Sequence, residues 1–202
     1  PTTSSPRRSN LDGARCTHRA QRCAEKCLQA TRGTGFEVTR YRIRALAGDI
    51  DTTQFKCGNS CLDEYIRRYA SQDVRRNVAR VFVAMPEDEP LRLAGFFTLS
   101  AGSVSCAELP ESLAKKLPRY PVPVALIGRL AVDNDFQGKG LGSIILADAC
   151  RKIAHASTAL AVAGIVVEAK NDAAATFYRH FGFLDLPGQP TRLLLPAKAF
   201  LD

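Results

Sequence analysis

The sequence has little that would suit a membrane or secreted protein. No apolar run approaches the ~18 residues that a membrane helix needs, and the polar N-terminus lacks the apolar stretch of a signal peptide. The seven cysteines are scattered, and no histidine lies at ligand spacing beside Cys23/Cys27 or Cys57/Cys61. We therefore expect free thiols, no bound metal, no membrane partner and a cytoplasmic location.

Positive charge is unevenly distributed along the chain. The 202 residues carry a formal net charge of +8, and residues 1–35 alone carry +5. Because this segment lacks steady apolar periodicity, we expect a disordered basic N-terminal extension, either a nucleic-acid arm or a segment with no role. Residues 36–202 are long enough to form one folded domain. A basic chain favours an acidic partner, such as nucleic acid or a phosphorylated ligand.

Hydrophobic patterning in the folded part predicts a run of strands followed by alternating strands and helices. Strands are expected at 39–46, 78–85, 93–106, 124–132, 164–168, 183–186 and 192–195, and helices after Asn59 and at 108–116, 141–155 and 171–180. In the first helix, Leu62, Tyr65, Ile66 and Tyr69 are expected on one side. This order is typical of a mixed sheet with helices on both faces.

The strand at 124–132 leads into a glycine turn and then a helix. Gly138, Gly140 and Gly142 alternate with other residues there, and glycine lets a backbone turn tightly and approach a ligand closely. The first N–H groups of the following helix have no internal partners, and the helix dipole makes that end positive. The turn therefore suits a pyrophosphate. The spacing fits neither a P-loop nor a dinucleotide fingerprint.

Two motifs together carry a resemblance to a known family. Gln137, Gly140 and Gly142 match the acetyl-CoA motif [Arg/Gln]-x-x-Gly-x-[Gly/Ala] of the GCN5-related N-acetyltransferases (GNAT). Further along, the family's second signature is matched by Asn171, Ala174, Phe177, Tyr178, Gly182 and Phe183. Residues 39–195 thus resemble this family. The resemblance implies an α/β (α+β) GNAT fold: a mixed sheet of about six to seven strands flanked by helices, with a splay between two parallel strands that holds acetyl-CoA.

The same resemblance implies a set of site residues and acetyl-CoA as co-substrate. The pantetheine arm would lie along Leu130, Ala131 and Val132, and the pyrophosphate on Gln137, Gly138, Lys139, Gly140, Leu141, Gly142 and Ser143. Asn171, Ala174 and Tyr178 would lie toward the thioester end. Tyr178 is the expected general acid for the leaving thiolate, its alternative being a core aromatic. A backbone N–H near Val132 would hold the oxyanion.

Other charged residues keep two interpretations each. Glu168 is either a proton relay through water or a solvated carboxylate, and Arg129 either contacts a tRNA acceptor end or forms a salt bridge. The arginines at positions 67, 68, 75, 76 and 80 form either a nucleic-acid surface or a solvated face. His155 and His180 are expected to be structural or exposed.

Three further segments resemble the GNAT toxins of bacterial type II toxin–antitoxin modules. They are Phe55-x-Cys57-Gly58 with Leu62, Tyr65 and Ile66; the segment 96–104; and the segment 128–132. The resemblance implies acetylation of the α-amine of aminoacyl-tRNA, which blocks translation, and a ribbon–helix–helix antitoxin as partner. It leaves a homodimer open. The rival hypotheses are a GNAT enzyme acting on a small amine or a protein amine, and a non-catalytic acetyl-CoA-binding module.

Overall fold

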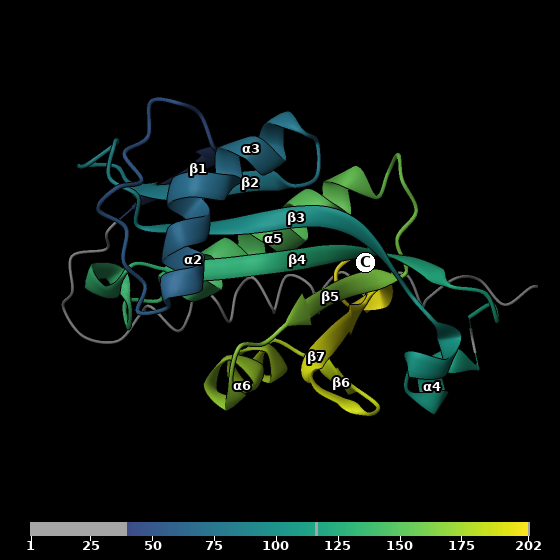
Figure 1. Cartoon of the computed structure of the whole chain (residues 1–202). Coiled ribbons are helices and arrows are strands. Elements are labelled where there is room, and N and C mark those ends of the chain that lie inside the picture. The colour runs from purple at the N-terminus through teal and green to yellow at the C-terminus, as the bar shows by residue number, and fades with distance from the viewer. Residues whose placement is uncertain (1–39, 116, 202) are drawn as a thin grey trace, which may run out of the picture.

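A computed structural model describes residues 40–115 and 117–201, which form one sheet with helices on both faces (Figure 1). The strands are β1 (Tyr41–Ala45), β2 (Arg80–Pro86), β3 (Gly95–Val104), β4 (Val122–Val132), β5 (Gly164–Glu168), β6 (Leu184–Leu186) and β7 (Gln189–Pro196), in the order β1-β2-β3-β4-β5-β7-β6. Only β4 and β5 pair in parallel within this sheet. The predicted mixed sheet is confirmed, whereas the expected extension 1–35 lies outside the described residues.

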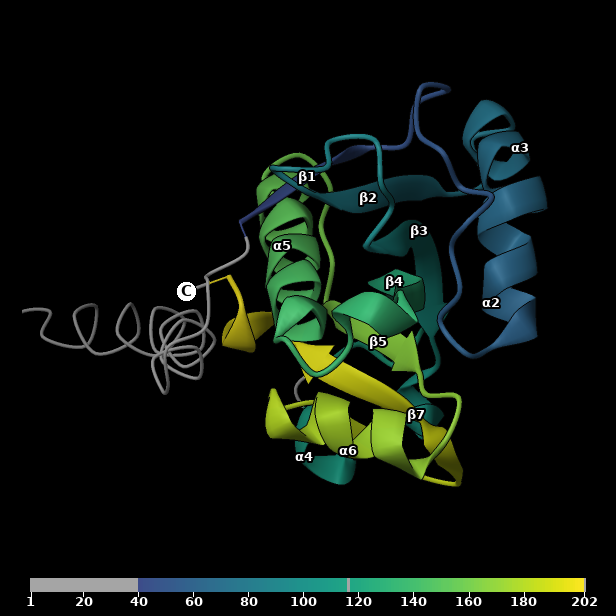
Figure 2. The same cartoon turned by 90° about the vertical axis from the view of Figure 1, so that its left-hand side faces the viewer.

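Helices cover both faces of the sheet. They are α2 (Ser60–Glu64), a π-helical segment (Tyr65–Tyr69), α3 (Ala70–Arg75), α4 (Glu111–Ala114), α5 (Leu141–Ala156) and α6 (Asp172–His180). Figure 2 shows α5 on one side of the sheet and α2 with α3 on the other. Side chains of α5 and α6 share one buried cluster, while those of α2 and α3 join a second cluster across the sheet. No helix in the described part of the chain is both long enough and apolar enough to span a bilayer.

The predicted helix boundaries follow from local capping. The Asn59 side chain accepts hydrogen bonds from the N–H groups of Cys61 (3.1 Å) and Leu62 (3.3 Å), which begins α2 as expected. In the same way Asn171 accepts a bond from the Ala174 N–H at 2.9 Å and begins α6. Gly182 follows α6 with φ +88, the left-handed conformation that ends many helices.

The prediction that Tyr69 shares the buried face of its helix is wrong. The Ala70 N–H donates to the Tyr65 carbonyl, so the helix between them is wound as a π-helix with one extra residue. The buried stripe therefore continues from Leu62, Tyr65 and Ile66 to Ala70, which is fully buried. Tyr69 is 47% exposed because the wider turn rotates it toward solvent.

The helix predicted over 108–116 is also wrong in extent. A 3-10 turn covers Cys106–Glu108, and α4 begins only at Glu111. Leu109 and Pro110 between them are extended, with ψ of 148 and 140. Proline disfavours helical conformation in the residue before it, so the two helical pieces cannot join.

The parallel pairing of β4 with β5 ends well before β4 does. Paired positions run from Ala125 opposite Ile165 to Ile127 opposite Val167. Beyond that point β4 continues to Val132 beside β3, whereas β5 ends at Glu168 and stays paired with β7. The edge of β4 from Gly128 to Val132 therefore has no partner in β5. This is the expected splay between two parallel strands.

A β-bulge lies where β4 leaves β5. Thr98 of β3 pairs with Arg129 and Leu99 with Ile127, so Gly128 has no opposite residue. Thr98 is 2% exposed, and its hydroxyl accepts a hydrogen bond from the Arg129 N–H at 3.0 Å. This bond satisfies a backbone N–H at the irregularity in the strand pairing. The extra residue reverses the alternation of side chains. Ile127 and Leu130 consequently both pack on the α5 side.

Gly164 is the tightest packed glycine in the described sheet, and this predicts a clear effect of an added methyl group. A Cβ at Gly164 would lie 2.7 Å from the Leu195 carbonyl oxygen and 2.8 Å from Leu194 Cδ1. Because the backbone of β7 cannot move aside cheaply, we expect Gly164→Ala to lower the free energy of unfolding by about 2 kcal/mol in a urea titration. Gly48→Ala is the matched control, since nothing lies within 4 Å of its Cβ position. Equal stability of the two variants would contradict the packing described here.

Candidate active site

A narrow cleft of about 40 Å³ lies at the splay. Its lining comes from α2, β4, the end of β5 and α6: Leu62, Ile127, Gly128, Arg129, Leu130, Glu168, Ala169, Lys170, Ala174 and Tyr178. Five of the residues singled out from the sequence thus share one cleft, namely Arg129, Leu130, Glu168, Ala174 and Tyr178. The open edge of β4 forms one wall, so main-chain groups are available there to a ligand that lies like an added strand.

Tyr178 lies in the wall of this cleft and is largely enclosed by the protein. It is 6% exposed and packs against the rings of Phe177 and Phe183, with centroids 5.3 and 5.4 Å away. Burial, with a smaller contribution from nearby Cys150, raises the pKa of Tyr178 to about 12. The phenol therefore stays protonated at neutral pH and is suited to give a proton rather than to take one.

The glycine turn adopts the conformation expected for an anion site. Gly138 and Gly140 have φ of +72 and +81, which side-chain-bearing residues rarely adopt. The first bonds inside α5 run from the N–H groups of Ser143 (3.1 Å) and Ile144 (3.3 Å) to the Gly140 carbonyl. The amides of the preceding helical residues therefore lie ahead of the intrahelical ladder, at the positive end of a 16-residue helix. This arrangement fits a pyrophosphate.

Gln137, expected among the phosphate-binding residues, uses its side chain inside the protein. Its amide nitrogen lies 2.9 Å from the Val132 carbonyl oxygen, 3.1 Å from that of Cys57 and 3.1 Å from Asn134 Oδ1. These contacts fasten the glycine turn to the end of β4 and to the segment before α2. Binding of the co-substrate by Gln137 stays a prediction.

Asp133 supports the loop before the glycine turn from outside the cleft, and the sequence analysis does not identify it. It is 4% exposed, and its carboxylate accepts hydrogen bonds from the N–H groups of Lys56 (2.8 Å) and Asp135 (3.0 Å). The Asn134 N–H also donates to the Lys56 carbonyl at 2.8 Å. The segment before α2 is thus tied to the loop that carries the glycine turn. The only signal in the sequence is an aspartate directly after a strand, which does not name its distant partner.

The Arg129 side chain stacks on an aromatic ring at the cleft. Its guanidinium carbon lies 3.7 Å above the centre of the Tyr65 ring, a cation–π contact. The Tyr65 hydroxyl donates to Asp73 Oδ2 at 3.0 Å. Burial and then this bond to Asp73 raise the pKa of Tyr65 to about 12. Among the described residues no carboxylate forms an ion pair with Arg129, so the salt-bridge interpretation finds no partner there, and the contact with a tRNA acceptor end stays a prediction.

Asn171 and Ala131 lie beside the cleft rather than in its lining. Asn171 is exposed, and its side-chain oxygen is used in the cap of α6. Ala131 is 5% exposed and packs in the α2–α3 cluster, so its main chain alone faces the open edge of β4. Their contacts with the co-substrate stay predictions.

Two of the five clustered arginines are engaged within the protein. Arg67 donates to the Phe55 carbonyl, and Arg68 pairs with Glu64 at 3.2 Å. The other three, Arg75, Arg76 and Arg80, are exposed.

His155 and His180 are exposed as expected. In residues 40–115 and 117–201 no cluster of three His, Cys, Asp or Glu side chains is arranged to hold a metal ion.

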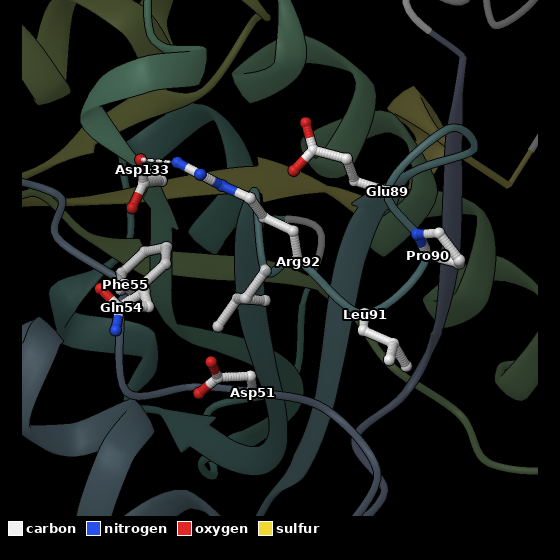
Figure 3. A pocket seen from close by; sticks show the side chains of 9 residues that line it. Asp51, Gln54, Phe55, Glu89, Pro90, Leu91, Arg92 and Asp133 are labelled. Carbon is white, nitrogen blue, oxygen red and sulfur yellow. Dashed lines mark ion pairs between the residues drawn. The ribbon is translucent and has the colours of Figure 1, made fainter.

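A wider and more open depression of about 370 Å³ lies elsewhere, between the segment after β1 and the β2–β3 loop (Figure 3). Asp51, Glu89 and Asp133 line it, and Arg92 lies among them. Arg92 forms an ion pair with Asp135 and lies 4.0 Å from Asp133. The depression contains neither Tyr178 nor the glycine turn, so its larger size does not make it the reaction site.

Cleft, glycine turn and open strand edge together define an acetyl-CoA-dependent N-acetyltransferase. A family model, the acetyltransferase (GNAT) domain, matches residues 77–184, and the chain belongs to that family. The chain is 37% identical over 155 residues to the "tRNA-acetylating toxin" of Mycobacterium tuberculosis (strain ATCC 25618 / H37Rv). The matched region covers 77% of this chain and 91% of that relative.

Two solved structures resemble this one over most of the chain. The first is AtaT complexed with acetyl-methionyl-tRNAfMet, with a TM-score of 0.74, 30% identity, and coverage of 79% of this chain and 96% of that one. The second is a mutant AtaT toxin bound to the C-terminus of the antitoxin AtaR and acetyl-CoA. There the TM-score is 0.68, the identity 26% and the coverage 80% and 96%.

The enclosed position of Tyr178 predicts an unusually late ionisation. Because burial disfavours the phenolate, the pKa is raised to about 12, and its proton should remain bound throughout the range in which an exposed tyrosine ionises near pH 10. Subtracting the ultraviolet titration curve of Tyr178→Phe from that of the wild type isolates the ionisation of this one phenol. A Tyr178 difference spectrum with its midpoint near pH 10 would contradict the enclosed site.

Proposed function

We propose that this chain is a toxin that acetylates the α-amine of aminoacyl-tRNA and so blocks translation. The observation that carries the proposal is a single cleft lined by the buried phenol of Tyr178 and by Arg129, an arginine without an ion-pair partner among the described residues. The first is suited to the acetyl transfer and the second to an anionic acceptor end. The relatives named for tRNA acetylation support the same acceptor.

The co-substrate would bind along the open edge of β4 and at the glycine turn. Main-chain groups of Leu130, Ala131 and Val132 would pair with the pantetheine arm. The pyrophosphate would rest on the segment 137–143, where Gly140 and the start of α5 present N–H groups. Acetyl-CoA supplies the acetyl group as a thioester. The AtaT structure with bound acetyl-CoA supports this assignment.

The transfer needs little help from a strong base. An α-amine has a pKa of about 8, and esterification of the neighbouring carboxyl lowers it further, so much of it is neutral at pH 7. The amine nitrogen would attack the thioester carbonyl; a C–N bond forms and the C–S bond breaks. As the amide forms, Tyr178 would give its proton to the leaving sulfur and then recover a proton from water, while the attacking nitrogen loses one proton. Glu168, exposed at the cleft, would carry that proton to water.

The partners of this activity belong to the same proposal. Because translation takes place in the cytoplasm, we propose that the reaction does so too. An antitoxin protein would restrain the enzyme, as supported by the AtaT toxin bound to its antitoxin AtaR. We propose the ribbon–helix–helix class for that antitoxin from the resemblance of segments 55–66, 96–104 and 128–132 to toxins of type II modules.

A transfer assay tests the acceptor directly. Protein and labelled acetyl-CoA are mixed with charged total tRNA, with the same tRNA after deacylation, and with polyamines and lysine peptides. We expect label on charged tRNA alone, because the other tRNA sample lacks the α-amine. Label on the polyamines or peptides alone would replace tRNA by a small or protein amine.

Replacing Tyr178 tests its role in the reaction. Tyr178→Phe keeps the ring and its packing but removes the proton donor, so we expect unchanged acetyl-CoA affinity and a fall in kcat of about 100-fold. Tyr120→Phe is the matched control, since Tyr120 is 66% exposed and lies outside the cleft. Calorimetric titration gives the affinity and the tRNA assay gives kcat. Wild-type turnover in Tyr178→Phe would remove this residue from the mechanism.

A further inference from the structure

Two irregularities of the backbone meet at one side-chain contact. The first is the β-bulge at Gly128 in β4, and the second is the π-helical segment Tyr65–Tyr69. They bring the Arg129 guanidinium and the Tyr65 ring to 3.7 Å from each other. Bulges and π-helical turns each disturb regular hydrogen bonding, and both are frequent next to functional sites. Here both irregularities meet at the edge of the cleft.

The bulge decides which face of the sheet Arg129 occupies. In a regular strand, residues two apart share a face, so Arg129 would lie with Ile127 among the apolar side chains beneath α5. With Gly128 inserted, Arg129 lies instead on the face that carries α2 and the π-helical segment. Thr98 holds this arrangement through its hydroxyl, which accepts the Arg129 N–H at 3.0 Å.

Tyr65 is in turn fixed from two sides. Its ring stacks on Phe96, with centroids 6.1 Å apart and an interplanar angle of 25°. Its hydroxyl donates to Asp73 at 3.0 Å, and the residue as a whole is 4% exposed. The ring therefore presents one rigid face to Arg129. Since a long arginine side chain loses considerable rotamer freedom on binding, a fixed platform lowers that cost in advance.

We propose that Tyr65, anchored by Asp73, is a positioning residue that aims the Arg129 guanidinium at a phosphodiester of the acceptor's single-stranded 3′ end. This inference rests on the proposed function and adds to it the group that is recognised and the residues that recognise it. A guanidinium stacked by its face keeps the N–H donors at its edge free, and these fit two phosphate oxygens at once. Arg129 lines the same cleft as Tyr178, so its position would set the distance between the phosphate and the reacting amine.

Kinetics with two acceptors separate positioning from general damage. One acceptor is charged tRNA, and the other is an amino-acid methyl ester, which has the α-amine but no phosphate. We expect Arg129→Ala and Tyr65→Leu to raise KM for charged tRNA about ten-fold, with a much smaller change for the ester and little change in kcat. For Arg129→Ala the slope of log(kcat/KM) against log[salt] should become shallower by about 1, as for one lost phosphate contact.

Conservative and matched variants sharpen the test. Tyr65→Phe keeps the platform and loses only the bond to Asp73, so most of the affinity for tRNA should return. Tyr69→Leu, a change of the same kind at the 47% exposed neighbouring tyrosine, should match the wild type. Because Tyr65 is also a core residue, acetyl-CoA affinity serves as the check that each variant is folded. Arg129→Ala, at a half-buried position, tests the contact even where Tyr65→Leu does not fold.

The outcomes distinguish this inference from the proposed function. Equal losses with tRNA and ester, or an unchanged salt slope in Arg129→Ala, would overturn the positioning role. If the wild type transfers no label to charged tRNA, the proposed function fails. Binding of an uncharged RNA oligonucleotide ending in CCA then decides the inference alone. A loss of about ten-fold in anisotropy-measured affinity for Arg129→Ala and Tyr65→Leu supports it, and wild-type affinity overturns it.

Discussion

The early end of the pairing between β4 and β5 is the constraint on which the rest of the site depends. Three paired positions hold the two strands together, the last being Ile127 opposite Val167. Beyond them the main chain of β4 is paired on the β3 side alone, and an unpaired strand edge satisfies its polar groups with a ligand or with water. The bulge at Gly128 lies at the same level. Cleft, open edge and re-aimed Arg129 are therefore consequences of one departure from regular sheet geometry.

The open edge is useful only because the surrounding loops are held still. Asp133 ties the segment before α2 to the end of β4, and Gln137 ties the glycine turn to the same place. Both bonds join a side chain to a main-chain group, 77 positions away for Asp133 and five for Gln137, so they fix the backbone itself. The helix N-terminus that would face the pyrophosphate and the strand edge that would face the pantetheine arm thereby keep a constant relation. A rigid arrangement of this kind lowers the entropy cost of binding a long, flexible co-substrate.

Much of the fold could be read from local patterns, because local causes produced it. Apolar runs predicted most of the strands, and the caps at Asn59 and Asn171 begin their helices where the sequence indicated. The failures have local causes as well, but ones without a pattern. A π-helical turn has no characteristic composition, so the sequence pattern predicts Tyr69 on the buried face in place of Ala70. Pro110 did carry a signal, since it stops α4 from extending backward.

The sequence by itself determined the family, the order of the elements, the glycine turn and Tyr178, because each depends on residues that are neighbours along the chain. Only the tertiary structure decided what surrounds them. Asp133 meets Lys56 across 77 positions, and Arg129 meets Tyr65 only because a bulge and a π-helical turn place them face to face. In neither pair are the two residues close enough in sequence for one short motif to contain both. Contacts between distant segments depend on how strands and helices pack. At this site, packing therefore determines which residues the charged side chains contact.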